Sequence, residues 1–162
     1  NQNGVREFMK LFGIGIDCSG FVYNQLFYSF NKIGRAQEFN DSLAWLNPEY
    51  KTVYQAGSFC FASNASKVIN ASDVRELDLI LKAYPNSEKY EHIALILKDD
   101  SGQLKIVQSG LTTLPDGVRV DNLNFENNSP IFGFKPDIGV SWEALYSEGR
   151  LEFRRLNILD EK

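Results

Sequence analysis

The chain has 162 residues, of which 43% are apolar and 23% are charged, and its net charge is −4. This length and composition predict a single domain over 1–162 with a buried core. The charge balance provides no basic stripe that could follow a phosphate backbone, so we expect no nucleic-acid partner. No apolar run approaches the roughly 20 residues that a membrane span requires, so we expect no transmembrane segment.

The first predicted element is an amphipathic helix that follows Asp17. Apolar side chains recur every three or four residues from Cys18 to Ile33, which is the period of one helix face, and Gly34 is expected to end the helix. A second helix is predicted over 35–46. Residues 50–72 are rich in Ser, Asn and Ala and carry no clear period.

The second half of the chain reads as strands. Short apolar or alternating segments are expected to form strands over 77–81, 93–97, 104–107, 131–134 and 151–156. Helices therefore come first and strands follow. This segregated order predicts an α+β domain in which an antiparallel sheet of about five strands packs against one buried N-terminal helix.

One cysteine lies where a nucleophile would be favoured. Asp17 is a preferred N-cap residue, so Cys18 is expected in the first helical turn, where free N–H groups and the helix dipole favour a thiolate. Gly20 is a poor helix residue, and its presence suggests that a substrate approaches the backbone closely. The alternative is that Cys18 simply begins the apolar face of the helix. Cys60 has no comparable context and is interpreted as a structural thiol.

The chain contains a single histidine, His92, at the start of an apolar strand. A three-residue hairpin loop with Gly102 in the left-handed conformation is expected after this strand. That loop would set Gln108 opposite Ala94, on the same face as His92 and within reach of its ring. A two-residue turn would place Gln108 on the opposite face. A solvent-facing glutamine and a structural histidine are the alternatives.

The segment Ile16 to Val22, with the sequence Ile-Asp-Cys-Ser-Gly-Phe-Val, resembles the nucleophile segment of the NlpC/P60 family of cysteine peptidases. Gly13 and Gly15 are similar to glycines that precede this segment in the family. The resemblance covers roughly 11–33 and 74–110.

Three later segments add to the resemblance. Residues 75–80 resemble the family segment that precedes the base, and the strand 92–97 resembles the strand that carries it. Gln108-Ser109-Gly110 is similar to the segment of the third catalytic residue. Glu91 departs from the family, which has a small or polar residue there. The resemblance implies a papain-like fold.

The resemblance also implies a function. Cys18, His92 and Gln108 would form a catalytic triad that hydrolyses a peptide bond through a thioester, and Asp17 and Ser19 would bind the free amine of the substrate. The implied substrate is a peptidoglycan stem peptide cut between γ-D-glutamate and the diamino acid. We expect no metal and no cofactor. Such a substrate favours an extracellular, periplasmic or cell-wall location over the cytoplasm, although the sequence itself leaves the compartment open.

Other functions compete with this one. A papain-like acyltransferase or amidase, including a toxin that acts on a rival's wall, would share the triad. A non-catalytic binding module would keep the fold with a protonated, unreactive Cys18. A zinc site is poorly supported, because one histidine and two distant cysteines lack metal-site spacing. The family's tyrosine before the nucleophile has no match, and Tyr23, Tyr28 and Tyr90 are candidate replacements.

Overall fold

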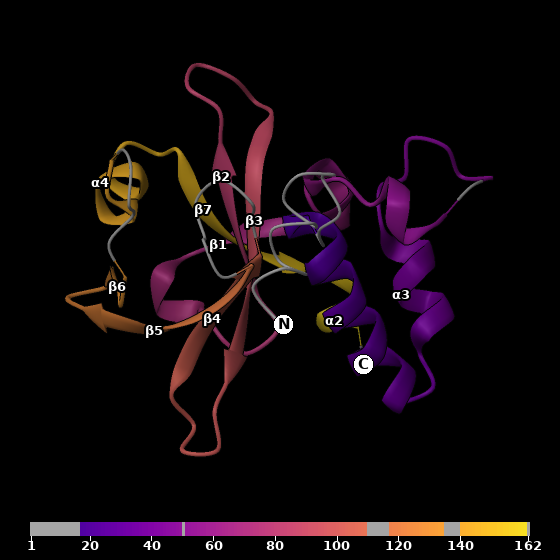
Figure 1. Ribbon diagram of the computed structural model, residues 1–162, viewed down its shortest axis with the longest axis horizontal. Coiled ribbons are helices and arrows are strands. Elements are labelled where there is room, and N and C mark those ends of the chain that lie inside the picture. Colours follow the sequence, from indigo (N-terminus) through magenta and orange to yellow (C-terminus); the bar gives the residue numbers. More distant parts are fainter. Residues whose placement is uncertain (1–16, 50, 110–116, 135–139, 162) are drawn as a thin grey trace, which may run out of the picture.

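The computed structural model describes residues 17–49, 51–109, 117–134 and 140–161 (Figure 1). In this part of the chain the α-helices are α2 (Cys18–Lys32), α3 (Ala36–Ser42) and α4 (Trp142–Ser147). The strands are β1 (Ser66–Ile69), β2 (Leu79–Ala83), β3 (Tyr90–Lys98), β4 (Leu104–Ser109), β5 (Val118–Glu126), β6 (Ser129–Phe132) and β7 (Leu151–Leu156). Short 3₁₀ turns η1 (Val53–Gln55), η2 (Ser58–Phe61), η3 (Ser63–Ala65), η4 (Ala71–Asp73) and η5 (Asn157–Leu159) connect them.

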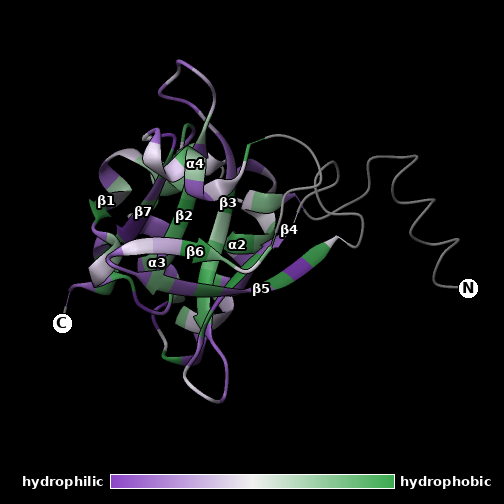
Figure 2. Cartoon of the chain, turned by 90° about the vertical axis from the view of Figure 1, so that its left-hand side faces the viewer, coloured by the Kyte–Doolittle hydropathy of each residue, from purple (hydrophilic) through white to green (hydrophobic). Residues whose placement is uncertain are grey.

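The strands form one curled antiparallel sheet in the order β1-β7-β2-β3-β4-β5-β6. The α+β class expected from the sequence is therefore confirmed, but the estimate of about five strands is wrong, since the described residues form seven. β1 was missed because it is a short edge strand that follows the Ser- and Asn-rich turns. β5 was missed because most of its residues are polar or exposed. Figure 2 shows hydrophilic and hydrophobic residues alternating along β5.

Both faces of the central strands are covered. Helices α2 and α3 lie on one side of the sheet, and α4 lies on the other side with β5 and β6 (Figure 1). In β2, Leu79 and Leu81 belong to the core under α2, whereas Ile80 belongs to the core on the opposite face. Strand β3 divides its residues in the same way. This double coverage explains why both strands are continuous apolar runs.

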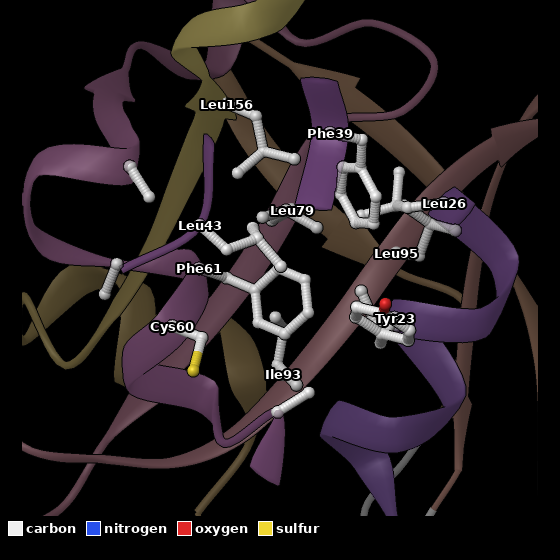
Figure 3. Packing of buried hydrophobic residues seen from close by; sticks show 14 of the residues in the cluster. Tyr23, Leu26, Phe39, Leu43, Cys60, Phe61, Leu79, Ile93, Leu95 and Leu156 are labelled. Atoms are coloured by element: carbon white, nitrogen blue, oxygen red, sulfur yellow. The ribbon is translucent and has the colours of Figure 1, made fainter. Parts of the chain in front are cut away.

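Helix α2 is the buried helix that the sequence predicted. Its apolar face includes Val22, Leu26 and Phe30, each at most 2% exposed. Figure 3 shows α2 side chains packed with residues of the sheet and of the turns before β1. Gly34 adopts φ +74°, a left-handed conformation suited to glycine at a helix end. The predicted end of the helix is therefore confirmed.

Several predicted boundaries were wrong. The strand expected over 131–134 covers Ser129–Phe132 instead. The helix expected over 35–46 covers only Ala36–Ser42, because Leu43 is extended and turns its side chain into the core. The strand expected over 77–81 begins at Leu79, because Leu77 has φ +70° and belongs to a turn.

A buried ion pair explains the turn before β2. Asp78 is fully buried, its Oδ2 accepts the backbone N–H of Arg75, and its two oxygens lie 2.7 and 2.8 Å from Nε and Nη2 of Arg155 on β7. The pair ties the start of β2 to β7. The segment 75–80, which resembles a family motif, thus has a structural role at Asp78.

Candidate active site

Asp17 caps helix α2 and sets the position of Cys18. The Asp17 carboxylate accepts the backbone N–H of Gly20 and the hydroxyl of Ser19, 3.2 Å away. A Cβ on residue 20 would lie 2.9 Å from this carboxylate oxygen, so a larger residue there would force the Asp17 cap to shift. The close approach inferred from the sequence is therefore made by Asp17. Cys18 is the first residue of the helix, as expected, and its side chain is half-buried.

The thiol of Cys18 lies where α2 meets strand β3. The backbone N–H groups of Ile93 and Ser19 and the hydroxyl of Ser58 interact with the sulfur. Ile93 directly follows His92, so the sulfur lies beside the backbone of the strand that carries the imidazole. Successive side chains of a strand point to opposite faces, so Ile93 packs in the core under α2, whereas His92 lies against Trp142 of α4. The ladder between β3 and β4 has its last pair at Leu95 and Val107, so β4 no longer pairs with β3 at Ile93.

Burial changes the charge state expected for this cysteine. Desolvation raises the pKa of the Cys18 thiol above its ordinary value, and the Asp17 carboxylate raises it further. The N–H groups of Ile93 and Ser19 and the Ser58 hydroxyl lower it, but they do not reverse the rise. Burial therefore opposes the thiolate that the start of the helix favours.

His92 and Gln108 form the hydrogen bond that the hairpin register predicted. The N–H of Asp99 donates to the carbonyl of Gln103 at 3.0 Å, and Gly102 between them has φ +85°. The resulting register brings His92 Nε2 within 2.8 Å of Gln108 Oε1. The three-residue loop is thus confirmed. Because an amide oxygen can only accept, Nε2 carries the proton and Nδ1 has the lone pair.

The imidazole of His92 is further enclosed by Trp142, whose ring lies edge-on to it at a centroid distance of 5.9 Å. Burial lowers the pKa of His92, although the hydrogen bond to Gln108 opposes this change. Glu91 forms an ion pair with Lys82 at 2.7 Å, and these two charges act on the imidazole in opposite directions. Both His92 and Cys18 therefore favour their neutral forms.

Gln108 is only 2% exposed, and its Nε2 has no hydrogen-bond partner among the described residues. A buried amide hydrogen bond donor without a partner costs about 1–3 kcal/mol. The Gln108 amide therefore bonds the imidazole through Oε1 and leaves its Nε2 donor unpaired among the described residues. This is the arrangement expected of a residue that positions a catalytic histidine.

The remaining predicted residues are distributed as follows. Ser19 is buried and donates to Asp17, which is exposed at the helix start, so the two residues expected to bind the substrate's amine bond to each other. Cys60 is buried and unoxidised, as expected for a structural thiol. Ile16, Gly13, Gly15 and Gly110 of the resembling segments lie outside the described residues.

The three candidate tyrosines differ in their surroundings. The hydroxyl of Tyr23 donates to Asn40 between α2 and α3, and Tyr28 is exposed on α2. Tyr90 begins β3, two residues before His92, and its hydroxyl donates to Glu152 on β7. Burial and this carboxylate raise the pKa of Tyr90 to about 12. Tyr90 is therefore the candidate on the same strand as His92.

A groove of about 800 Å³ includes Ser58 in its lining, and the Ser58 hydroxyl interacts with the Cys18 thiol. Cys18, His92 and Gln108 are not themselves among the residues that line it. Its lining residues come mainly from the loop after α3, from η2, from the β2–β3 hairpin and from β7. They are Leu46, Ser58, Phe59, Ala62, Ser63, Ala83, Tyr84, Ser87, Glu88, Lys89, Tyr90, Gly149, Arg150, Glu152 and Arg154.

Sequence reasoning missed Ser58, Trp142 and the groove. Ser58 lies in the stretch without a clear period, and Trp142 begins a six-residue helix in the region that resembles nothing in the family. The residues are brought to the site by long-range packing, for which the sequence carries no local signal.

No protein-family model matches the sequence, and neither a curated protein nor a solved structure gives a significant match. Within the described ranges, no three or more potential ligands among His, Cys, Asp and Glu are grouped as a metal site would need. In the same part of the chain, no helix has both the length and the apolar character required to cross a membrane.

Proposed function

We propose that this protein is a cysteine peptidase or amidase, similar in fold and chemistry to the papain-like NlpC/P60 enzymes, with Cys18 as nucleophile. The observation that carries the proposal is the 2.8 Å hydrogen bond from His92 Nε2 to Gln108 Oε1. His92 is followed in the chain by Ile93, whose backbone N–H interacts with the Cys18 sulfur. A nucleophile, a base and a residue that orients the base are the parts that covalent catalysis requires.

The resting pair in this mechanism is a neutral thiol and a neutral imidazole. His92 Nδ1 accepts the proton of the Cys18 thiol as the sulfur bonds to the carbonyl carbon of the scissile amide. The C–N bond then breaks, and the imidazolium gives the proton to the leaving amine. Water hydrolyses the thioester with His92 again as base, which releases the acid and restores the thiol.

The oxyanion formed during attack needs hydrogen-bond donors at the start of α2. The backbone N–H of Cys18 belongs to the first helical turn, whose N–H groups have no acceptor within the helix. These donors are fixed before the substrate arrives, because the Asp17 cap holds the turn. Preorganised donors of this kind are usually the largest source of transition-state stabilisation.

The proposed substrate is a peptidoglycan stem peptide cut after γ-D-glutamate, outside the cytoplasm. Asp17 is exposed and charged, so it can bind a free ammonium group while its other contacts hold the helix start. An ammonium at Asp17 would also offset the negative charge that raises the pKa of Cys18. Substrate binding would thus favour the thiolate at the moment it is needed.

A second candidate function is a non-catalytic binding module. The observation that favours it is the raised pKa of the Cys18 thiol, which keeps the sulfur protonated near neutral pH. The two functions differ in whether His92 activates the sulfur. A related acyltransferase or wall-amidase toxin would share the activated sulfur and differ in the acceptor.

The deciding experiment measures the pH dependence of Cys18 alkylation by iodoacetamide in the parent chain and in His92→Ala. Cys18→Ala serves to subtract Cys60. For a peptidase we expect the rate to rise as His92 loses its proton, below the ordinary histidine pKa, and then to stay level up to the raised pKa of the thiol. His92→Ala should lose this plateau and react only above the thiol pKa.

A single rise in alkylation rate at high pH, the same in both chains, would exclude the peptidase and support the binding module. If the plateau depends on His92, incubation with wall fragments, with and without an added amine acceptor, then separates hydrolysis from acyl transfer.

A further inference from the structure

The groove that Ser58 lines also includes two charged residues of β7, Glu152 and Arg154. Arg154 is fully paired there: it donates to Glu152 at 2.7 Å and to the hydroxyl and carbonyl of Ser66 at 2.8 and 2.9 Å. Glu152 also accepts the hydroxyl of Tyr90. These contacts join three strands, so Arg154 and Glu152 stabilise this part of the groove and neutralise each other.

Arg150 lies in the same groove and is not paired in this way. The guanidinium donates to the carbonyl of Ala83 at 3.4 Å and lies 3.8 Å from a carboxylate oxygen of Glu148, both at the outer limit of such interactions. Its Nε is buried without a partner among the described residues. The guanidinium therefore has hydrogen-bonding capacity that the protein itself does not use.

The backbone of Arg150 is firmly held, although its side chain is weakly paired. Its N–H donates to the carbonyl of Leu145 at 2.9 Å, which closes the end of α4, and its carbonyl accepts the N–H of Ala83 at 2.8 Å beside β2. A cation on a fixed backbone can bind a ligand with little loss of conformational freedom.

The charge and shape of the groove indicate what it binds. Its lining includes three basic residues and two acidic ones, in a chain whose net charge is −4. With Arg154 and Glu152 paired, the lining keeps two basic residues, Lys89 and Arg150, and one acidic residue, Glu88. It also includes the exposed apolar side chains of Leu46, Phe59 and Tyr84.

We propose that this groove binds a carboxylate of the substrate and that Arg150 is the residue that receives it. A guanidinium presents a planar fork of donors that matches a carboxylate with two parallel hydrogen bonds, which a lysine cannot provide. The apolar lining residues accept the aliphatic part of the same peptide. This inference rests on the proposed function, because it treats the groove as part of the substrate site of Cys18.

The test measures binding to the Cys18→Ala chain, in which no turnover occurs, by calorimetry. The probes are the tetrapeptide L-Ala-γ-D-Glu-L-Lys-D-Ala, its C-terminal carboxamide, and the form with a carboxamide at the α-carbon of D-Glu. The variants are Arg150→Gln and Arg150→Lys, with Arg35→Gln, at the residue before α3, as a matched loss of one charge outside the groove.

We expect one of the two carboxamides to bind about tenfold or more weakly than the acid, which identifies whether the bound group is the chain end or the D-Glu carboxylate. Arg150→Gln should weaken the acid by the same factor and leave that carboxamide unchanged, and Arg150→Lys should recover part of the loss. Arg35→Gln should bind like the parent.

Equal affinity for all three peptides, absence of binding, or the same small effect of Arg150→Gln and Arg35→Gln would each overturn the inference. Failure of the proposed function would show in a different experiment. There, Cys18 alkylation would not depend on His92, and that result does not involve Arg150.

Discussion

Replacing Gln108 with leucine tests whether the residue acts on the imidazole. Leucine has a similar volume and cannot accept a hydrogen bond. It removes the buried Nε2 that has no partner among the described residues, but it also takes the acceptor from the His92 N–H, so we expect Gln108→Leu to fold with a stability close to that of the parent. The hydrogen bond to Gln108 raises the pKa of His92, and its loss should let burial lower that pKa further.

The size of the kinetic effect follows from the contact. A 2.8 Å hydrogen bond from a charged imidazole is worth about 1.5–3 kcal/mol, and about 1.4 kcal/mol corresponds to a tenfold change in rate. The His92-dependent plateau of Cys18 alkylation should therefore fall about tenfold to a hundredfold in Gln108→Leu. The rise before the plateau should move to lower pH.

Two measurements check this prediction. The chain has one histidine, so a single imidazole signal in an NMR titration reports the pKa of His92 without assignment. Alkylation rates across the same pH range report the plateau. Our reasoning is refuted if Gln108→Leu folds and both the imidazole titration and the plateau match those of the parent.

Asp17→Asn keeps a capping acceptor but removes the charge that raises the pKa of Cys18, so the thiolate should form at lower pH; Asp17→Ala should in addition cost about 1 kcal/mol of stability in urea unfolding. An unchanged onset of alkylation in Asp17→Asn contradicts this. Asp78→Asn leaves the Arg155 guanidinium buried without its counter-charge, so unfolding in urea should show a loss of about 3–5 kcal/mol, and a loss under 1 kcal/mol would disprove the role of the pair. The Asp99 carboxyl has its pKa lowered to about 2, mainly by the serine hydroxyl of its own hairpin loop. Its stabilising effect should be present above the ordinary carboxyl pKa and lost as pH falls through about 2, and an NMR titration with a midpoint near 4 would contradict this.

The hairpin between β3 and β4 could be predicted from the sequence because its geometry is local. One glycine in the left-handed conformation fixes the loop length, and the two-residue period of strands then fixes which side chains share a face. The contact between His92 and Gln108 follows from these two facts. The start of α2 was predictable for the same reason, since a cap involves neighbouring residues.

Features that depend on long-range packing could not be predicted. The approach of Ser58 to Cys18 and of Trp142 to His92 depends on how turns and a short helix pack against distant strands. The charge state of Cys18 belongs to this group. A helix start lowers the pKa of a thiol locally, but the opposing desolvation depends on what covers the residue.

Strand β3 pairs with β4 from Leu95 to Lys98. Ile93, two residues before this paired part, contacts Cys18, which is distant in the sequence. During folding, the hairpin that joins His92 to Gln108 closes a short loop, whereas the contact with Cys18 must close a much longer one. The pair of His92 and Gln108 can therefore form before Cys18 arrives. Under the proposed mechanism, a partly folded chain has its cysteine apart from His92, so the thiol would remain unactivated until the last long-range contacts are made.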